Sequence, residues 1–133
     1  MQQKYILDDQ AVATLLATAK QEAKKQQWAV TICVTDDGGH VLGLLRLDGA
    51  APMSALIAQE KAKTAALARK ETLVYETMIN QGRTAFLSAP LHGLLEGGLP
   101  IMMDGQCIGA VGVSGLSSDL DAKLARLAIA SIF

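Results

Sequence analysis

Residues 95–115 read LEGGLPIMMDGQCIGAVGVSG and contain the strongest turn signal in the chain. Two apolar runs flank the pair Asp104-Gly105, and an Asp-Gly pair between such runs is typical of a two-residue hairpin turn. Strands joined in this way must pair antiparallel, whereas parallel strands need a long crossover. The stretch therefore predicts a β-hairpin and favours an antiparallel sheet over a doubly wound parallel one.

A second hairpin is predicted over residues 28–47. Residues 28–34, WAVTICV, are mostly β-branched or apolar, which is typical of a largely buried strand. The DDGG that follows supplies turn residues, and residues 41–47 form the returning strand.

Helices are expected where a capping residue or an alanine-rich stretch free of glycine and proline occurs. Their expected places are from a cap at Asp8 or Asp9, about residues 53–70, and from a cap at Ser117 or Ser118. A shorter helix within residues 71–86 would stop at Gly82. This order of elements predicts an α+β fold with a single antiparallel sheet flanked by helices.

Composition limits the class of protein. The 133 residues, 50% hydrophobic and 19% charged, fit one domain spanning residues 1–133. Twelve basic residues against thirteen acidic ones leave a net charge of −1, which provides no footprint for a nucleic acid. The first ten residues carry charges where a secretory signal needs an apolar run, and no later run is long enough to span a membrane. The expected location is the cytoplasm.

Small side chains dominate the predicted core. Aromatic residues make up only 4% of the chain, so glycine and alanine must let backbones approach closely. Such surfaces also pack well against a second copy, which favours a homo-oligomer. Cys33 and Cys107 lie far apart within apolar runs and are interpreted as core thiols, not as a disulfide.

Several catalytic and metal-binding motifs are absent. Gly112 and Ser114 are followed by Leu116, where the nucleophile elbow of serine hydrolases requires glycine. The glycine spacings match neither a dinucleotide-binding nor a phosphate-binding loop, and the two histidines form no zinc-binding pattern. No metal site is predicted.

Three charged residues remain as candidates for a site. His40 follows the tight Gly38-Gly39 turn, and Arg46 lies in an apolar strand, where it either pairs with a carboxylate or binds an anionic ligand. On a helix over residues 53–70, Lys61 and Arg69 project from the small-residue face. Burial of an unpaired ammonium is costly, so Lys61 needs either a salt bridge or a ligand.

Taken together, four stretches resemble the GlcG/HbpS family, which includes the C-terminal domain of PduO-type proteins. The stretches are VTDDGGHVLGLLRLDGAAP, AQEKAKTAAL, GGLPIMMDGQCIGAVGVSG and DLDAKLARLA. The likeness covers nearly the whole chain in order and spacing, and it is greatest to GlcG proteins of glycolate-utilisation operons.

The resemblance implies a profilin-like α+β fold and homo-oligomers. It also implies binding of heme or a related tetrapyrrole and an accessory role beside glycolate, glycerol or diol metabolism. The family positions carried over to this chain give the expected cofactor-binding residues His40, Arg46, Asp48, Lys61 and Ser114. In that site Arg46 and Lys61 would hold carboxylates, and His40 would approach the metal or a polar edge.

Two other functions are compatible with the same residues. In an enzyme acting on a small hydroxy- or keto-acid, Lys61 or His40 would serve as acid or base while Arg46 holds the carboxylate. In a non-catalytic scaffold for a partner enzyme, the charged residues would form interface salt bridges. Turnover would identify the first, and contacts across subunits the second.

Overall fold

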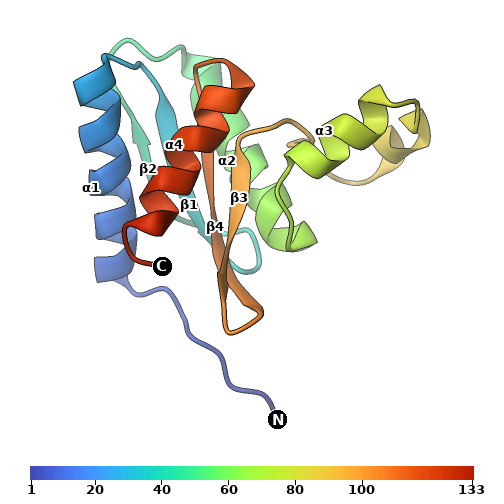
Figure 1. Ribbon diagram of the computed structural model, residues 1–133, viewed down its shortest axis with the longest axis horizontal. Helices are drawn as coiled ribbons and strands as arrows, with labels where there is room; N and C mark the ends of the chain where they lie inside the picture. Colours follow the sequence, from blue (N-terminus) through green and yellow to red (C-terminus); the bar gives the residue numbers. More distant parts are fainter.

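A four-stranded antiparallel sheet forms the centre of the computed structural model, which describes residues 1–133 (Figure 1). Its strands are β1 (Thr31–Asp36), β2 (Val41–Arg46), β3 (Gly98–Met103) and β4 (Gln106–Ser114). The spatial order β2-β1-β4-β3 places the two predicted hairpins side by side through β1 and β4. The α+β fold with a single antiparallel sheet is thus confirmed.

Helices cover both faces of the sheet. α1 (Asp9–Gln26) and α4 (Ser118–Ala130) cover one face, and α2 (Pro52–Ala68) covers the other. α3 (Leu73–Asn80) and the short 3-10 helix η1 (Thr84–Ser88) lie beside the sheet. The predicted cap at Asp8 is present, because its side chain accepts a hydrogen bond of 2.8 Å from the Ala11 N–H. None of these helices combines the length and apolar character needed to cross a membrane.

The main core lies between the sheet and the pair α1 and α4. Alternate side chains of β1, such as Ile32 and Val34, pack there with Leu15 of α1 and Leu124 of α4. Successive side chains of a strand point to opposite faces, so the residues between them face α2. The sheet is therefore buried on both sides by helices from distant parts of the sequence.

The second layer, between the sheet and α2, is filled mainly by small side chains such as those of Cys33, Ala58 and Ala62. Gly112 of β4 pairs with Cys33 on one side and with Gly98 on the other. A Cβ added at Gly112 would lie 2.2 Å from the Ala58 carbonyl oxygen. The backbone of α2 thus rests directly on the sheet, which confirms the role predicted for the small residues.

Both cysteines are buried and unbonded, as predicted. Burial raises the pKa of the Cys33 thiol to about 12. One expectation for α2 is wrong: the helix ends at Ala68, and Arg69 adopts a left-handed conformation with φ of 58°. Because of this reversal Arg69 leaves the small-residue face and becomes exposed, whereas Lys61 stays buried on it.

Candidate functional site

Two of the predicted site residues, His40 and Arg46, lie at opposite ends of strand β2. His40 precedes the strand with 83% of its side chain exposed, and Arg46 ends the strand, also exposed. At a rise of about 3.3 Å per residue, their backbones lie about 20 Å apart. The chain by itself does not bring His40 and Arg46 together.

Arg46 and Ser114 lie in one row across the sheet. Both pair with Thr31 of the central strand β1, so two strand spacings, about 10 Å, separate their Cα atoms. The row faces α2, since the Thr31 hydroxyl lies 2.8 Å from the Ser54 hydroxyl. Arg46 and Ser114 therefore share one end and one face of the sheet without contact.

Lys61 forms a salt bridge within the chain. Its Nζ donates to Oδ2 of Asp121 and to the Val113 carbonyl oxygen, each at 3.0 Å. Both side chains are almost fully buried, and Oδ1 of Asp121 accepts from the Leu116 N–H at 3.0 Å. Burial raises the pKa of Asp121 above its ordinary 3.8, while Lys61 opposes that rise. Of the two roles open to Lys61, the chain thus displays the salt bridge.

Asp48 lies elsewhere again. It is exposed and lines a cavity of about 390 Å³ together with Lys24, Trp28 and Leu47, beside the end of α1. None of the four main cavities is lined by His40, Arg46, Lys61 or Ser114. A joint site of these five residues stays a prediction, and it would need a second copy to complete it.

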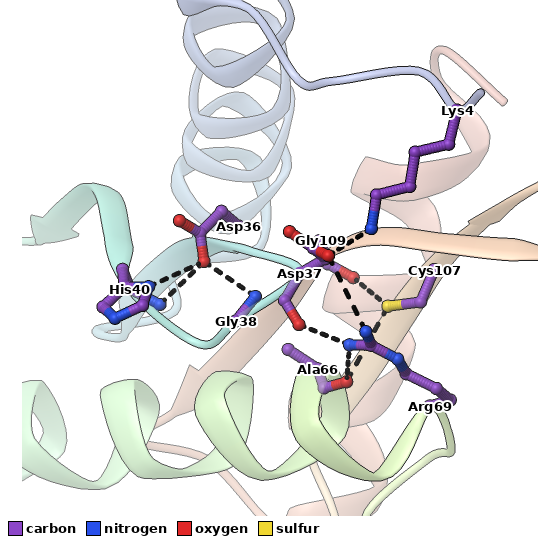
Figure 2. A network of polar contacts seen from close by, with 9 residues as sticks. All are labelled: Lys4, Asp36, Asp37, Gly38, His40, Ala66, Arg69, Cys107 and Gly109. Atoms are coloured by element: carbon purple, nitrogen blue, oxygen red, sulfur yellow. Dashed lines mark hydrogen bonds and ion pairs between the residues drawn. The ribbon is translucent and has the colours of Figure 1, made fainter. Parts of the chain in front are cut away.

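A polar network organises the β1–β2 turn (Figure 2). Oδ1 of Asp36 accepts hydrogen bonds of 2.9 Å from the N–H groups of Gly38 and His40. The same oxygen lies 3.3 Å from Nδ1 of His40. The imidazole is therefore part of the turn, and its Nδ1 is occupied.

The next carboxylate, Asp37, connects three segments of the chain. It binds Lys4 of the N-terminal segment and lies 3.7 Å from the guanidinium of Arg69, which also donates to the Ala66 carbonyl oxygen at 2.6 Å (Figure 2). The hydrogen bond from Lys4 lowers the pKa of Asp37. The network connects the N-terminus and the end of α2 to the β1–β2 hairpin.

Asp37→Asn is expected to destabilise the protein only slightly at neutral pH, by less than about 1 kcal/mol, because the ion pairs are partly exposed. The pKa of Asp37 is lower in the folded than in the unfolded state, so its stabilisation is present above 3.8 and is lost as the pH falls through the lowered value. Urea unfolding should therefore show a difference at neutral pH that disappears in acid.

Asp104→Asn is the matched control for this variant, because Asp104 is exposed in the other hairpin turn and forms no ion pair. If the loss of unfolding free energy in Asp37→Asn at neutral pH persisted unchanged in acid, it would contradict a stabilising role for the ionised Asp37 carboxylate.

Sequence reasoning missed a cavity of about 460 Å³ beside α3. We call it the lobe cavity; its lining residues are Glu76, Ile79, Asn80, Leu87, Leu91, His92, Leu94 and Leu95. This volume is within the range of small-molecule sites. A signal was present: residues 87–95 contain four leucines interrupted by Pro90 and Gly93, so they cannot continue a helix or strand and instead line an irregular apolar hollow.

The side chains of the lobe cavity suit a metal that is already held by a porphyrin ring better than they suit a bare metal ion. No group of three or more His, Cys, Asp or Glu side chains is placed to hold an ion. The lobe cavity offers five aliphatic side chains and one imidazole, that of His92. A metalloporphyrin needs an apolar surface and a single axial ligand from the protein, so these residues fit such a group.

Most of the chain matches a family model and a known protein. Residues 7–130 match the family model described as haem degrading protein HbpS-like. Protein GlcG of Escherichia coli K12 is 56% identical over 114 residues, which cover 86% of this chain and 85% of GlcG. These two matches confirm the family resemblance.

Two solved structures share the fold. A double mutant of HbpS from Streptomyces reticuli superposes with a TM-score of 0.88 at 30% identity, covering 100% of this chain and 91% of that one. The PduOC:heme complex superposes with a TM-score of 0.85 at 26% identity, covering 96% and 95%. With a family model that spans nearly all of its length and GlcG as a relative over more than two thirds of it, the chain belongs to the HbpS-like family.

Proposed function

We propose that this protein is a cytoplasmic, homo-oligomeric accessory protein that binds heme or a related tetrapyrrole and serves glycolate, glycerol or diol metabolism. The observation that carries the proposal is the likeness to the PduOC:heme complex over 96% of the chain. The match to the family model of a haem degrading protein and the identity to GlcG support it further. A bound heme would supply an iron centre, while the protein supplies its ligand and apolar surroundings.

The chain keeps some of its candidate residues free for such a ligand. Arg46 has no carboxylate partner among the ion pairs of the chain, so its guanidinium is available to an anionic group at a subunit boundary. Lys61 is engaged with Asp121 and contributes to stability instead. The part proposed for His40, Asp48 and Ser114 depends on a neighbouring subunit.

Titration of the purified protein with hemin tests this proposal. We expect a saturable shift of the Soret band, because an axial ligand and an apolar pocket both change the absorption of the iron porphyrin. Protein unfolded in urea serves as the control for hemin that adheres without a folded site. Absence of a shift with folded protein, or an equal shift with unfolded protein, would overturn the proposal.

A further inference from the structure

One part of the chain stands apart from the two-layered core. The lobe, consisting of α3, η1 and residues 89–97, projects beside the β3 edge of the sheet (Figure 1). No residue of α3 or η1 is buried, and the exposed leucines include Leu87 at 63% and Leu95 at 44%. A helix of eight residues is not stable alone in water, so contacts within the lobe must hold its shape.

Contacts between its segments and with β3 hold the lobe in place, among them a hydrogen bond of 3.3 Å from the Glu96 N–H to Oε1 of Glu76. The rings of Tyr75 and Phe86 stack with centroids 4.8 Å apart and an interplanar angle of 3°. At the base, the buried Thr72 hydroxyl donates to the Leu95 carbonyl oxygen and accepts from the Gly98 N–H at 3.0 Å. These contacts join α3 to η1 and the start of α3 to Leu95, which lines the lobe cavity.

The polar groups of the lobe cavity come from both walls. Glu76 and Asn80 lie four residues apart on α3 and therefore share one face of that helix. His92 comes from the opposite loop and is followed by Gly93, where an added Cβ would lie 2.1 Å from the Glu60 carbonyl oxygen. Because that loop rests on the backbone of α2, the position of His92 is fixed relative to the core.

The chain has two histidines, and only one is placed to bind a ligand in this cavity. Nδ1 of His40 contacts Asp36, and its ring belongs to an exposed turn. The His92 imidazole lines the lobe cavity and has no hydrogen-bond or ion-pair partner within the chain. A neutral imidazole nitrogen is a common axial ligand of heme iron.

We propose that the lobe cavity binds the ring of a metalloporphyrin and that His92 is the axial ligand of its metal. This inference rests on the tetrapyrrole binding proposed above and names its site. The lining contains Glu76 and no lysine or arginine, so propionates find no cation within it and stay toward solvent. Binding then depends on the apolar walls and on the bond to the metal.

The two histidines provide a matched experiment. In hemin titrations, His92→Ala is expected to lose the histidine-ligated Soret band of the wild type, whereas His40→Ala keeps it. Added free imidazole should restore the ligated spectrum of the His92→Ala protein, because it replaces the missing ligand without repairing any other contact. Circular dichroism and urea unfolding confirm that both variants are folded.

A second pair of variants tests the apolar walls. Leu87→Glu should weaken binding of metal-free protoporphyrin IX, measured by its fluorescence, because it places a charge against the ring. Leu67→Glu is the control, since Leu67 is 47% exposed on α2 and does not line the lobe cavity. His92→Ala should change protoporphyrin IX binding little, since no metal bond is involved.

The outcomes separate this inference from the proposed function. If the wild type binds hemin and His92→Ala gives the same spectrum, the assignment of His92 is overturned while tetrapyrrole binding stands. If Leu87→Glu leaves porphyrin binding intact and instead reduces the oligomer measured by light scattering, the lobe is a subunit contact and the inference fails. If the wild-type protein does not bind hemin, the proposed function is overturned, and the assignment of His92 is overturned with it.

Discussion

Lys61→Met is expected to lower the free energy of unfolding by about 3–5 kcal/mol, as is usual when one partner of a buried ion pair is removed. Lys61 is 3% exposed and Asp121 is 2% exposed, so no water replaces the lost ammonium. The remaining carboxylate keeps only the hydrogen bond from the Leu116 N–H. Urea unfolding at neutral pH measures the loss.

The matched control is Lys63→Met, because Lys63 is an exposed lysine two residues further along the same helix. Its effect should stay within about 0.5 kcal/mol. The double variant Lys61→Met/Asp121→Leu should recover most of the loss, since it leaves no buried charge. A double variant as unstable as Lys61→Met would show that packing, and not the charge, causes the loss.

The loss of stability caused by Lys61→Met should also depend on pH, in a direction that the pKa of Asp121 sets. Burial already raises the pKa of Asp121, and without Lys61 it rises further. A carboxyl whose folded pKa is raised favours the folded state below its unfolded pKa and loses that advantage as the pH rises through the folded value. The deficit of Lys61→Met is therefore smallest below pH 3.8 and grows toward neutral pH.

Gly112→Ala is expected to cost about 3 kcal/mol or more, at or above the upper end of the usual cost of overpacking. The new Cβ would lie 2.2 Å from the Ala58 carbonyl oxygen and 2.6 Å from the Ala62 nitrogen. Both are backbone atoms of α2, so no rotamer change relieves the clash and the helix must move off the sheet. The midpoint of urea unfolding, or loss of the cooperative transition, reports the effect.

Gly38→Ala is the control for this second variant. Gly38 has a negative φ, and the nearest atoms to its added Cβ belong to the flexible His40 and Asp36 side chains at 3.1–3.4 Å. Its cost should be below about 1 kcal/mol. A Gly112→Ala protein as stable as Gly38→Ala would mean that α2 adjusts freely, contrary to the close packing described.

Local signals account for most of the fold. The Asp104-Gly105 pair predicts the β3–β4 hairpin because both residues must adopt positive φ, and they do so at 51° and 75°. Asp8 predicts the start of α1 because its side chain caps the helix. The reversal at Arg69 carries no comparable signal, because no glycine marks the end of α2 there.

The site was harder to predict because its contacts are not local. Asp121 lies 60 positions from Lys61, and its sequence neighbourhood indicates only the first turn of a helix. The lobe cavity combines α3 with a loop that has no periodicity, so His92 is recognisable only after the two walls are placed together. Residue types identified candidates, whereas their grouping required the three-dimensional structure.

The exposed lobe also affects how this protein can diversify. α3 and η1 contribute no buried side chain to the core. Substitutions there are therefore expected to change the free energy of unfolding of the sheet very little. For a ligand bound in the lobe as proposed, substitutions that change its selectivity would therefore cost little stability, unlike substitutions at Gly98 and Gly112, which lie against the backbone beside or beneath α2. Under that proposal, ligand selectivity would change without any change in the packing of the sheet.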